Sequence, residues 1–284
     1  MCATRTELFD GPGLVALVGT VPKGSLATHG DGGTPAPGAS FGVVHAVPTD
    51  RAVLDAIDRC ARTSGAYLVG ALTSSRGDHV MATGAGVTRH GVSAALFSPD
   101  VAVATGLSQG CAPLGPVRRV TGARDQTIST IDGRPALEVL AADLHAAGAR
   151  DASGLLVAFP IAGSDTGNYL VRNLVGIDPR AGTVMVAHDT APGDAIQFRR
   201  RDAQAARQDL DRMLAGLKRR APDPRGALYF SCLARGPNLF GPDSQELRAI
   251  ADAFSGVPLA GFFGNGEICA GRLYTYTGVL ALFL

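Results

Sequence analysis

Two stretches in the last quarter of the chain combine charged side chains with glycines. They read FSCLARG (230–236) and GFFGNGEICAG (261–271), and each begins as an apolar strand. Arg235 lies near the end of the first stretch, and Glu267 directly follows the inner glycines of the second. A guanidinium binds a carboxylate through two parallel hydrogen bonds, whereas a carboxylate accepts from an ammonium group. If the strands are neighbours, their ends predict a pocket for a zwitterionic ligand such as an amino acid.

The second stretch also has a purely structural interpretation. Gly264 and Gly266 can adopt a positive φ, which suits a strand that ends in a turn. The two adjacent phenylalanines must point to opposite faces of the strand, and we expect the second, Phe263, to cover a ligand beside Asn265. In the structural alternative, Glu267 caps backbone N–H groups instead of binding a ligand.

Other polar residues in glycine-bounded stretches are weaker candidates for ligand contacts. A free cysteine such as Cys232 is usually a small buried hydrophobe, although Arg235 close by would lower the pKa of an accessible thiol. Gln109 and Cys111 belong to SQGCAPLGP, a stretch stiffened by glycines and prolines. Its backbone N–H groups can bind an anion, or the stretch can be a plain connector.

Arg172 and Asn173 interrupt the otherwise apolar stretch LVRNL. Burial of such polar groups without a partner would cost several kcal/mol. We therefore expect one of the two to meet either a ligand or an internal carboxylate, such as Asp178 or Asp202.

Composition narrows the range of partners. The 26 lysines and arginines nearly balance 25 acidic residues, and charged residues make up only 18% of the chain, so no charged field favours nucleic acid or an anionic membrane. The sequence has neither a signal-peptide pattern nor an apolar run of about 20 residues. The five cysteines are odd in number and widely spaced, which predicts free thiols in a cytoplasmic protein.

Common catalytic and cofactor motifs are missing from the sequence. The six histidines show neither HxH nor HExxH spacing, and the chain has no GxSxG motif and no phosphate-binding P-loop. We therefore expect no metal, no cofactor and no catalysis. A cysteine hydrolase is a less favoured alternative, with Cys232 or Cys269 as nucleophile and His188 as base, because such groups assemble in space and not in sequence.

Apolar periodicity predicts alternating strands and helices. A helix is expected from Asp50, as N-cap, to Gly65, which ends it. The stretch 201–220 places apolar residues every three or four positions and is the clearest helix. Apolar runs at 14–20 and 66–72 predict strands on either side of the first helix.

The fold class follows from the order of these elements. Residues 79–107 resemble three successive strands joined by short turns, which predicts an antiparallel meander. Combined with the strand–helix–strand pattern, this predicts an α/β (mixed α+β) fold with mixed and antiparallel sheets and helices on the outer faces.

Six motifs give the chain a resemblance to a known family. They are GLSQGCAPLGPVRRVT, IDGRPALEVL, NYLVRNLVGID, GDAIQFRRRDAQAARQDL, FSCLARG and VPLAGFFGNGEI. Their order and spacing resemble those of the FIST family of proposed intracellular sensory proteins, from about Leu14 onwards. The resemblance implies two related halves, which we place at 1–125 (FIST-N-like) and 126–284 (FIST-C-like). The first half looks shortened relative to the family.

The resemblance also implies a function. It predicts a non-catalytic domain that binds a small ligand, amino acids being the usual suggestion, and passes a signal to a separate partner protein. The rival hypothesis is a protein-interaction scaffold. A sensor should hold the candidate residues around a closed pocket, whereas a scaffold should carry them on an open face with a large apolar patch.

Overall fold

The computed structural model describes residues 1–9, 13–30, 38–75, 77–83, 86–149, 154–161, 163 and 167–284. The chain forms two compact units. Unit 1 contains Met1–Gly110 and Ala206–Leu284, and unit 2 contains Cys111–Ala205. The boundary expected at residue 125 falls inside unit 2, in the turn between two paired strands. Whether the two family-like halves are separate folding domains stays a prediction.

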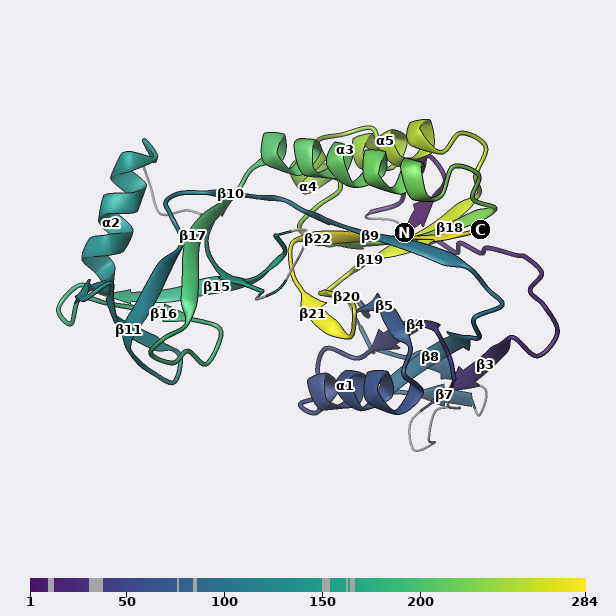
Figure 1. Cartoon of the computed structure of the whole chain (residues 1–284), viewed down its shortest axis with the longest axis horizontal. Helices are drawn as coiled ribbons and strands as arrows, with labels where there is room; N and C mark the ends of the chain where they lie inside the picture. The colour runs from purple at the N-terminus through teal and green to yellow at the C-terminus, as the bar shows by residue number, and fades with distance from the viewer. Residues whose placement is uncertain are drawn as a thin grey trace. The chain divides into compact units, whose positions relative to one another are not determined.

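The first sheet of unit 1 has the strand order β2-β1-β19-β18-β22-β9. Only β18 and β19 are parallel, and the helix α5 (Gln245–Ala253) lies between them in sequence. α5 and α3 (Ala203–Arg220) cover one face of this sheet (Figure 1), where Leu210, Leu217 and Ile250 are core residues. The strands are β1 (Cys2–Ala3), β2 (Thr6–Glu7), β9 (Val103–Gln109), β18 (Gly226–Cys232), β19 (Leu259–Gly264) and β22 (Thr277–Phe283).

The second sheet of unit 1 has the order β21-β20-β5-β4-β8-β3. Its one parallel pair, β4 and β5, is joined by α1 (Val53–Ser64), which covers the outer face with Val53, Ile57 and Cys60. The strands are β3 (Leu26–His29), β4 (Phe41–Ala46), β5 (Tyr67–Leu72), β8 (Val92–Phe97), β20 (Glu267–Cys269) and β21 (Arg272–Tyr274). A separate hairpin consists of β6 (Met81–Thr83) and β7 (Gly86–Thr88).

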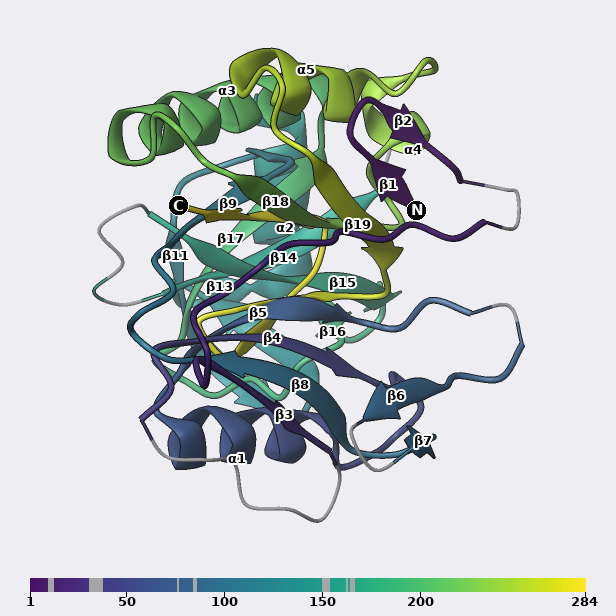
Figure 2. The same ribbon diagram turned by 90° about the vertical axis from the view of Figure 1, so that its right-hand side faces the viewer.

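The two sheets of unit 1 pack face to face, so the unit has four layers in the order helix, sheet, sheet, helix (Figures 1 and 2). Aromatic rings fill the space between the sheets. Phe41 lies 6.1 Å from Phe283 between ring centroids, and His45 lies 5.0 Å from Phe262. The predicted fold class, with helices on the outer faces, is confirmed.

Unit 2 is an antiparallel sheet that closes on itself. Six strands pair in a ring in the order β17-β11-β12-β16-β15-β14, because β14 also pairs with β17. α2 (Ala136–Ala146) packs Val139 and Leu140 into the core of this unit. The strands are β10 (Cys111–Pro113), β11 (Arg118–Arg124), β12 (Thr127–Ile131), β13 (Arg134–Pro135), β14 (Leu155–Pro160), β15 (Tyr169–Asp178), β16 (Thr183–Val186) and β17 (Ala195–Arg201).

Local sequence signals placed most helices and strands correctly. α1 ends at Gly65, whose φ of 70° is the left-handed conformation that a C-terminal glycine supplies. The N-cap position differs from the prediction: Asp50 lies two residues before Ala52, the N-cap, and accepts a hydrogen bond from the Ala52 N–H at 2.9 Å.

Two predictions about strands are wrong. Residues 14–20 form no strand, and Leu14 and Val18 are 93% and 91% exposed. An apolar run becomes a strand only where a pairing partner is available, and none of the described strands pairs with this one. The meander over 79–107 is also wrong, because β8 pairs with β3 and β4 whereas β9 pairs with β22 in the other sheet. A short connection between apolar strands does not require that they pair.

Candidate functional site

The two charged stretches are neighbours in the structure. β18 and β19 run parallel in one sheet, and their register places Cys232 opposite Gly264. FSCLARG and GFFGNGEICAG therefore leave the sheet side by side at the same end, which is the adjacency that the pocket prediction required.

Arg235, however, does not face a ligand space. Its side chain has no exposed surface and forms an ion pair with Glu246 of α5, whose Oε1 lies 2.7 Å from both Nε and Nη2. The guanidinium also donates to the carbonyl oxygen and the hydroxyl of Ser108, at 3.4 and 3.2 Å. The structure thus corrects the expected contact with a ligand carboxylate, because a carboxylate of the chain itself takes that place.

Glu246 is the centre of this buried polar network. It also accepts hydrogen bonds from the Tyr229 hydroxyl at 2.6 Å, the Ser231 hydroxyl at 3.1 Å and the Gly236 N–H at 3.0 Å. The sequence does not single out Glu246, because a glutamate in the first turn of an amphipathic helix usually points to solvent. The signal that could have found it is Arg235, since a buried guanidinium requires a carboxylate partner.

Glu267 is also fully buried. Its Oε2 accepts from the N–H of Thr277 at 3.1 Å and from the Thr277 hydroxyl at 2.7 Å, whereas Oε1 has no hydrogen-bond partner among the described residues. Burial raises the pKa of this carboxyl to about 8, although the Thr277 donors and the charge of Arg235 oppose the shift. The carboxyl is therefore largely protonated at neutral pH. Its hydrogen bonds to Thr277 hold the start of β22, in agreement with the alternative in which Glu267 caps backbone N–H groups.

The two inner glycines of the second stretch have different roles. Gly266 has a φ of 122°, which a residue with a side chain rarely adopts. Gly264 does not need a positive φ; a methyl group there would lie 2.6 Å from the Cβ of Ala71. Close packing of β19 against β5 therefore requires Gly264, and the turn into β20 requires Gly266.

Unit 1 contains a cavity of about 730 Å³ beside the end of β19. Its apolar lining includes Phe9, Phe262 and Phe263, and its polar lining consists of His45, Thr73, Ser74, Ser75, His79, Ser93 and Asn265. Among the described residues, none of the lining side chains is a lysine, arginine, aspartate or glutamate. The side chains of the described lining residues therefore offer aromatic surface and hydrogen bonds without a full charge.

Two of the predicted contact residues, Phe263 and Asn265, line this cavity. Phe263 packs against Phe9 with ring centroids 4.9 Å apart, while Phe262 packs against His45 on the other side of the strand. The two adjacent phenylalanines thus lie on opposite faces, as expected, and both contribute to the cavity wall. The other predicted residues of unit 1 are not among the described lining residues: Gln109, Cys232, Gly264, Gly266, Arg235 and Glu267.

Two histidines that the sequence left without a role also line the cavity. The imidazole of His45 packs against the rings of Phe230 and Phe262, and burial lowers its pKa to about 4, so it is neutral at neutral pH. His79 Nδ1 lies 2.8 Å from the hydroxyl oxygen of Thr73. The signal for His45 is its position in FGVVHAV, where one polar residue interrupts a buried strand.

All five cysteines are buried, and none of them forms a disulfide with another described residue. Burial and the nearby Glu267 raise the pKa of the Cys232 thiol to about 12. Burial also raises the pKa of Cys269, whose sulfur lies 3.3 Å from the Tyr67 hydroxyl. A thiol in such surroundings stays protonated, and the thiolate is the reactive form. Both sites therefore lack the activation that a cysteine hydrolase needs.

The remaining predicted contacts are divided between the units. Gln109 ends β9 in unit 1 and is buried, and its backbone N–H donates to Asp209 at 2.6 Å. Cys111 begins β10 in unit 2, and Arg172 and Asn173 lie on β15 of the same unit. These last three residues therefore belong to a unit other than the one that holds the cavity.

Neither a metal cluster nor a transmembrane helix is found in the part of the chain that the structure describes. No three histidine, cysteine, aspartate or glutamate side chains gather there as metal ligands. None of the helices there combines the length and the apolar character needed to cross a membrane.

Comparison with known proteins places these features in a family context. The FIST N domain matches residues 15–134 and the FIST C domain matches residues 136–270. An uncharacterized protein of Mycobacterium tuberculosis is 36% identical over 191 residues, and one of Mycobacterium bovis is 37% identical over 194 residues. Each match covers 63% of this chain and 50% of the relative, so the chain spans about half the length of these curated relatives. FIST domains are associated with sensory signalling.

Proposed function

Because this chain belongs to the FIST family, we propose that it is a non-catalytic sensory domain that binds a small metabolite in the cavity of unit 1. The cavity is the observation that carries this proposal. Its volume of about 730 Å³ lies within the range of about 300–1,000 Å³ that is typical of small-molecule sites. Its lining combines apolar and aromatic side chains with hydrogen-bonding groups, which are the two kinds of contact that fix a small ligand in such sites.

Amino acids are the ligand class that we propose. The hydroxyl of Ser75 and the amide of Asn265 can each accept from an ammonium group and donate to a carboxylate, while Phe262 and Phe9 can cover an apolar side chain. Since none of the described lining side chains carries a full charge, apolar and aromatic amino acids fit this cavity better than acidic or basic ones, whose side-chain charge would lose its hydration.

The same observations favour a sensor over a protein-interaction scaffold. A scaffold would carry the charged residues of the two stretches on an open face, whereas Arg235 and Glu267 are both fully buried. The loop residues Thr73 to Ser75 line the cavity at the point where the chain leaves β5. A ligand there would change the order of this loop, which a separate partner protein would read.

A thermal-shift screen of the whole chain against the twenty amino acids and a panel of uncharged metabolites tests the proposal. A ligand at about 100 times its Kd adds roughly 2.7 kcal/mol of stability. This corresponds to an increase in Tm of about 5–11 °C for a protein of this size class. A screen in which no amino acid raises Tm would overturn the ligand class.

Two alanine variants test the location of the site. Asn265 is exposed and lines the cavity, so Asn265→Ala should leave the Tm of the unliganded protein unchanged and reduce the ligand-induced shift. Gln204, an exposed amide on α3, provides the matched control, and Gln204→Ala should keep the full shift. If both variants respond to ligand as the unmodified chain does, the ligand binds elsewhere.

A further inference from the structure

Arg172 is a half-buried cation without an acidic partner among the described residues. It lies on β15, opposite Val157 of β14, and shares a face of the strand with Leu170 and Leu174, which pack against the apolar core of unit 2. Its guanidinium donates to the backbone carbonyl oxygen of Val171 at 2.8 Å. The remaining N–H groups therefore have no protein acceptor in the part of the chain that the structure describes.

The two internal carboxylates that the sequence suggested as partners bind elsewhere. Asp178 accepts a hydrogen bond from the backbone N–H of Arg180 at 2.8 Å, and Asp202 accepts from that of Ala205 at 2.7 Å. The cost of burying the guanidinium of Arg172 is thus not offset by either of them. A partly desolvated guanidinium with free donors is the group that most readily binds an external oxyanion.

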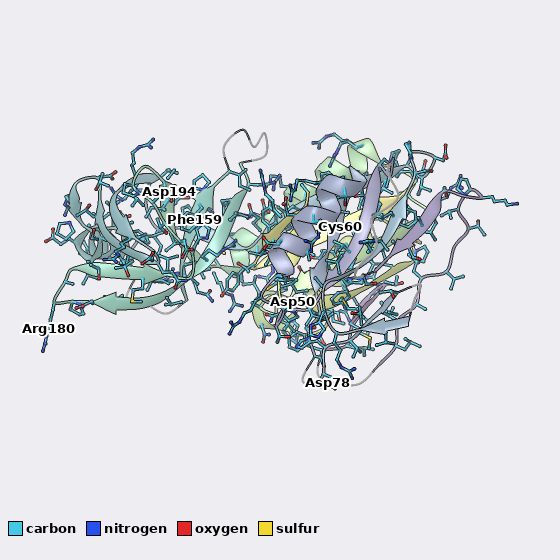
Figure 3. The ribbon with its side chains drawn as sticks, turned by 90° about the horizontal axis from the view of Figure 1, so that it is seen from below. Asp50, Cys60, Asp78, Phe159, Arg180 and Asp194 are labelled. Atoms are coloured by element: carbon cyan, nitrogen blue, oxygen red, sulfur yellow. The ribbon has the colours of Figure 1, made fainter. Side chains whose placement is uncertain are left out.

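His188 lies near Arg172, just after the next strand, β16. The N–H of Ala187 donates to the carbonyl oxygen of Asn173 at 2.9 Å, which holds the chain just beyond β16 against β15, near Arg172. The imidazole packs against Phe159, with ring centroids 4.6 Å apart. Figure 3 shows Phe159 among the strands of unit 2. A second nitrogen donor and an aromatic surface therefore adjoin the guanidinium.

The charges around His188 fit an electropositive site. Burial and the positive charge of Arg172 lower the pKa of His188, while Asp194 and Asp189 oppose this shift. Asp194 accepts from the backbone N–H of Ala191 at 2.8 Å. The positive charge of Arg172 therefore acts on the imidazole together with burial.

We propose that Arg172 and His188 form an oxyanion-binding site in unit 2, which takes the carboxylate or phosphate group of a small ligand against the ring of Phe159. The free N–H groups of Arg172 bind two oxygens of the anion, and the imidazole N–H of His188 donates to one of them. This site is separate from the cavity of unit 1 and does not depend on the function proposed for that cavity.

An NMR titration of the whole chain tests the proposal. The probes are sodium phosphate and sodium acetate, each compared with sodium chloride at equal ionic strength, and the His188→Gln variant assigns the His188 signal. We expect a saturable shift of this signal with phosphate, acetate or both, and a higher pKa of His188, because the bound anion neutralises the charge of Arg172. A response to phosphate alone or to acetate alone identifies the anion class. Titrations in which neither probe shifts the signal beyond the chloride control overturn the site.

Two arginine variants separate specific binding from a general effect of charge. Arg172→Gln should weaken binding of the active probe by about tenfold or more, the usual consequence of losing a charge-assisted hydrogen bond. Arg180→Gln is the matched control, because Arg180 is exposed and its side chain projects away from the ribbon of unit 2 (Figure 3). This variant should bind the probe unchanged. The five other histidine signals report whether each variant is folded.

Arg172→Lys keeps the positive charge but loses the planar guanidinium fork. It replaces Arg172→Gln in this test if Arg172→Gln does not fold. It should bind the probe more weakly than the unmodified chain. Equal binding by the unmodified chain and by the folded Arg172 variant would show that the guanidinium is not a ligand and would overturn the proposal.

Discussion

The guanidinium of Arg235 and the carboxylate of Glu246 form an ion pair with no exposed surface on either side chain. The pair joins the end of β18 to α5 and so fixes the helix on the sheet. Taking two charges out of water is offset only when the remaining polar atoms are also hydrogen-bonded. Tyr229, Ser231 and Ser108 supply those bonds. The network therefore has a structural role beside the cavity, in a place where the sequence suggested a ligand contact.

Removing one partner of this pair should destabilise the protein strongly. Glu246→Gln and Arg235→Met each leave buried groups without their partners, and each should lower the free energy of unfolding by about 3–5 kcal/mol. Urea denaturation followed by far-UV circular dichroism measures this change. Arg5 and Asp252 form an ion pair of 2.6 Å with side chains 54% and 65% exposed, so Arg5→Met is the control and should cost about 1 kcal/mol or less.

The double variant gives a sharper test of the same network. Arg235→Met combined with Glu246→Leu leaves no lone buried charge, so its cost should be smaller than the sum of the costs of Arg235→Met and Glu246→Leu measured singly. Additive costs, or costs no larger than that of Arg5→Met, would show that the two side chains are not coupled in solution.

Glu267 should make stability depend on pH in the opposite direction from an ordinary carboxylate. Its pKa rises from 4.5 to about 8 in the folded protein, so between these values the folded state binds more protons than the unfolded state. The stabilising contribution is complete below about pH 4.5 and is lost as pH rises towards 8, at up to about 1.4 kcal/mol per pH unit. Glu7 contributes with the same sign, because its pKa is raised to about 7.

Glu267→Gln isolates this contribution, because the amide oxygen can still accept the two Thr277 hydrogen bonds while the group no longer ionises. Urea denaturation from pH 5 to 9 should show the variant close to the unmodified chain at pH 5 and more stable than it at pH 9. A difference between the two proteins that is the same at every pH would mean that Glu267 does not titrate in this range.

The sequence predicted those elements whose signals are local. Gly65 ends α1, and the apolar spacing within 201–220 gives α3, because a helix depends on residues three and four positions apart. The prediction of a strand at 14–20 was wrong because distant parts of the chain decide whether an apolar run finds a strand to pair with. The same distinction applies to the site. The adjacency of β18 and β19 was expected. His45 and Glu246 lie on other elements, and only the packing of sheets and helices brings His45 to the cavity and Glu246 to Arg235.

Residues 1–112 should not fold alone. In unit 1, β5 pairs with β20 and β9 pairs with β22, so the first half of the chain depends on strands that lie after residue 260. The fragment would expose two unpaired strand edges and the apolar faces between the sheets. Its far-UV circular dichroism should show no cooperative thermal transition, whereas the whole chain should show one. A cooperative transition in the fragment would contradict the two-sheet arrangement of unit 1.

Gly261 should be the glycine of β19 that tolerates alanine least. It lies opposite Tyr229 in the parallel pair of β18 and β19, and a methyl group at Gly261 would overlap the backbone carbonyl of Tyr229. Backbone cannot rotate away as a side chain can, so Gly261→Ala must separate the two strands and should cost about 3 kcal/mol or more in urea denaturation.

Gly216 of α3 is the control, because a methyl group there meets only the far end of the Arg219 side chain. Gly216→Ala should stabilise the protein by about 0.5–1 kcal/mol, the usual gain in a helix interior. Because β19 also carries Phe262 and Phe263 of the cavity wall, Gly261→Ala should weaken any ligand-induced increase in Tm, and Gly216→Ala should preserve it. Equal stabilities of the two variants would show that β18 and β19 are not as closely paired as the structure has them.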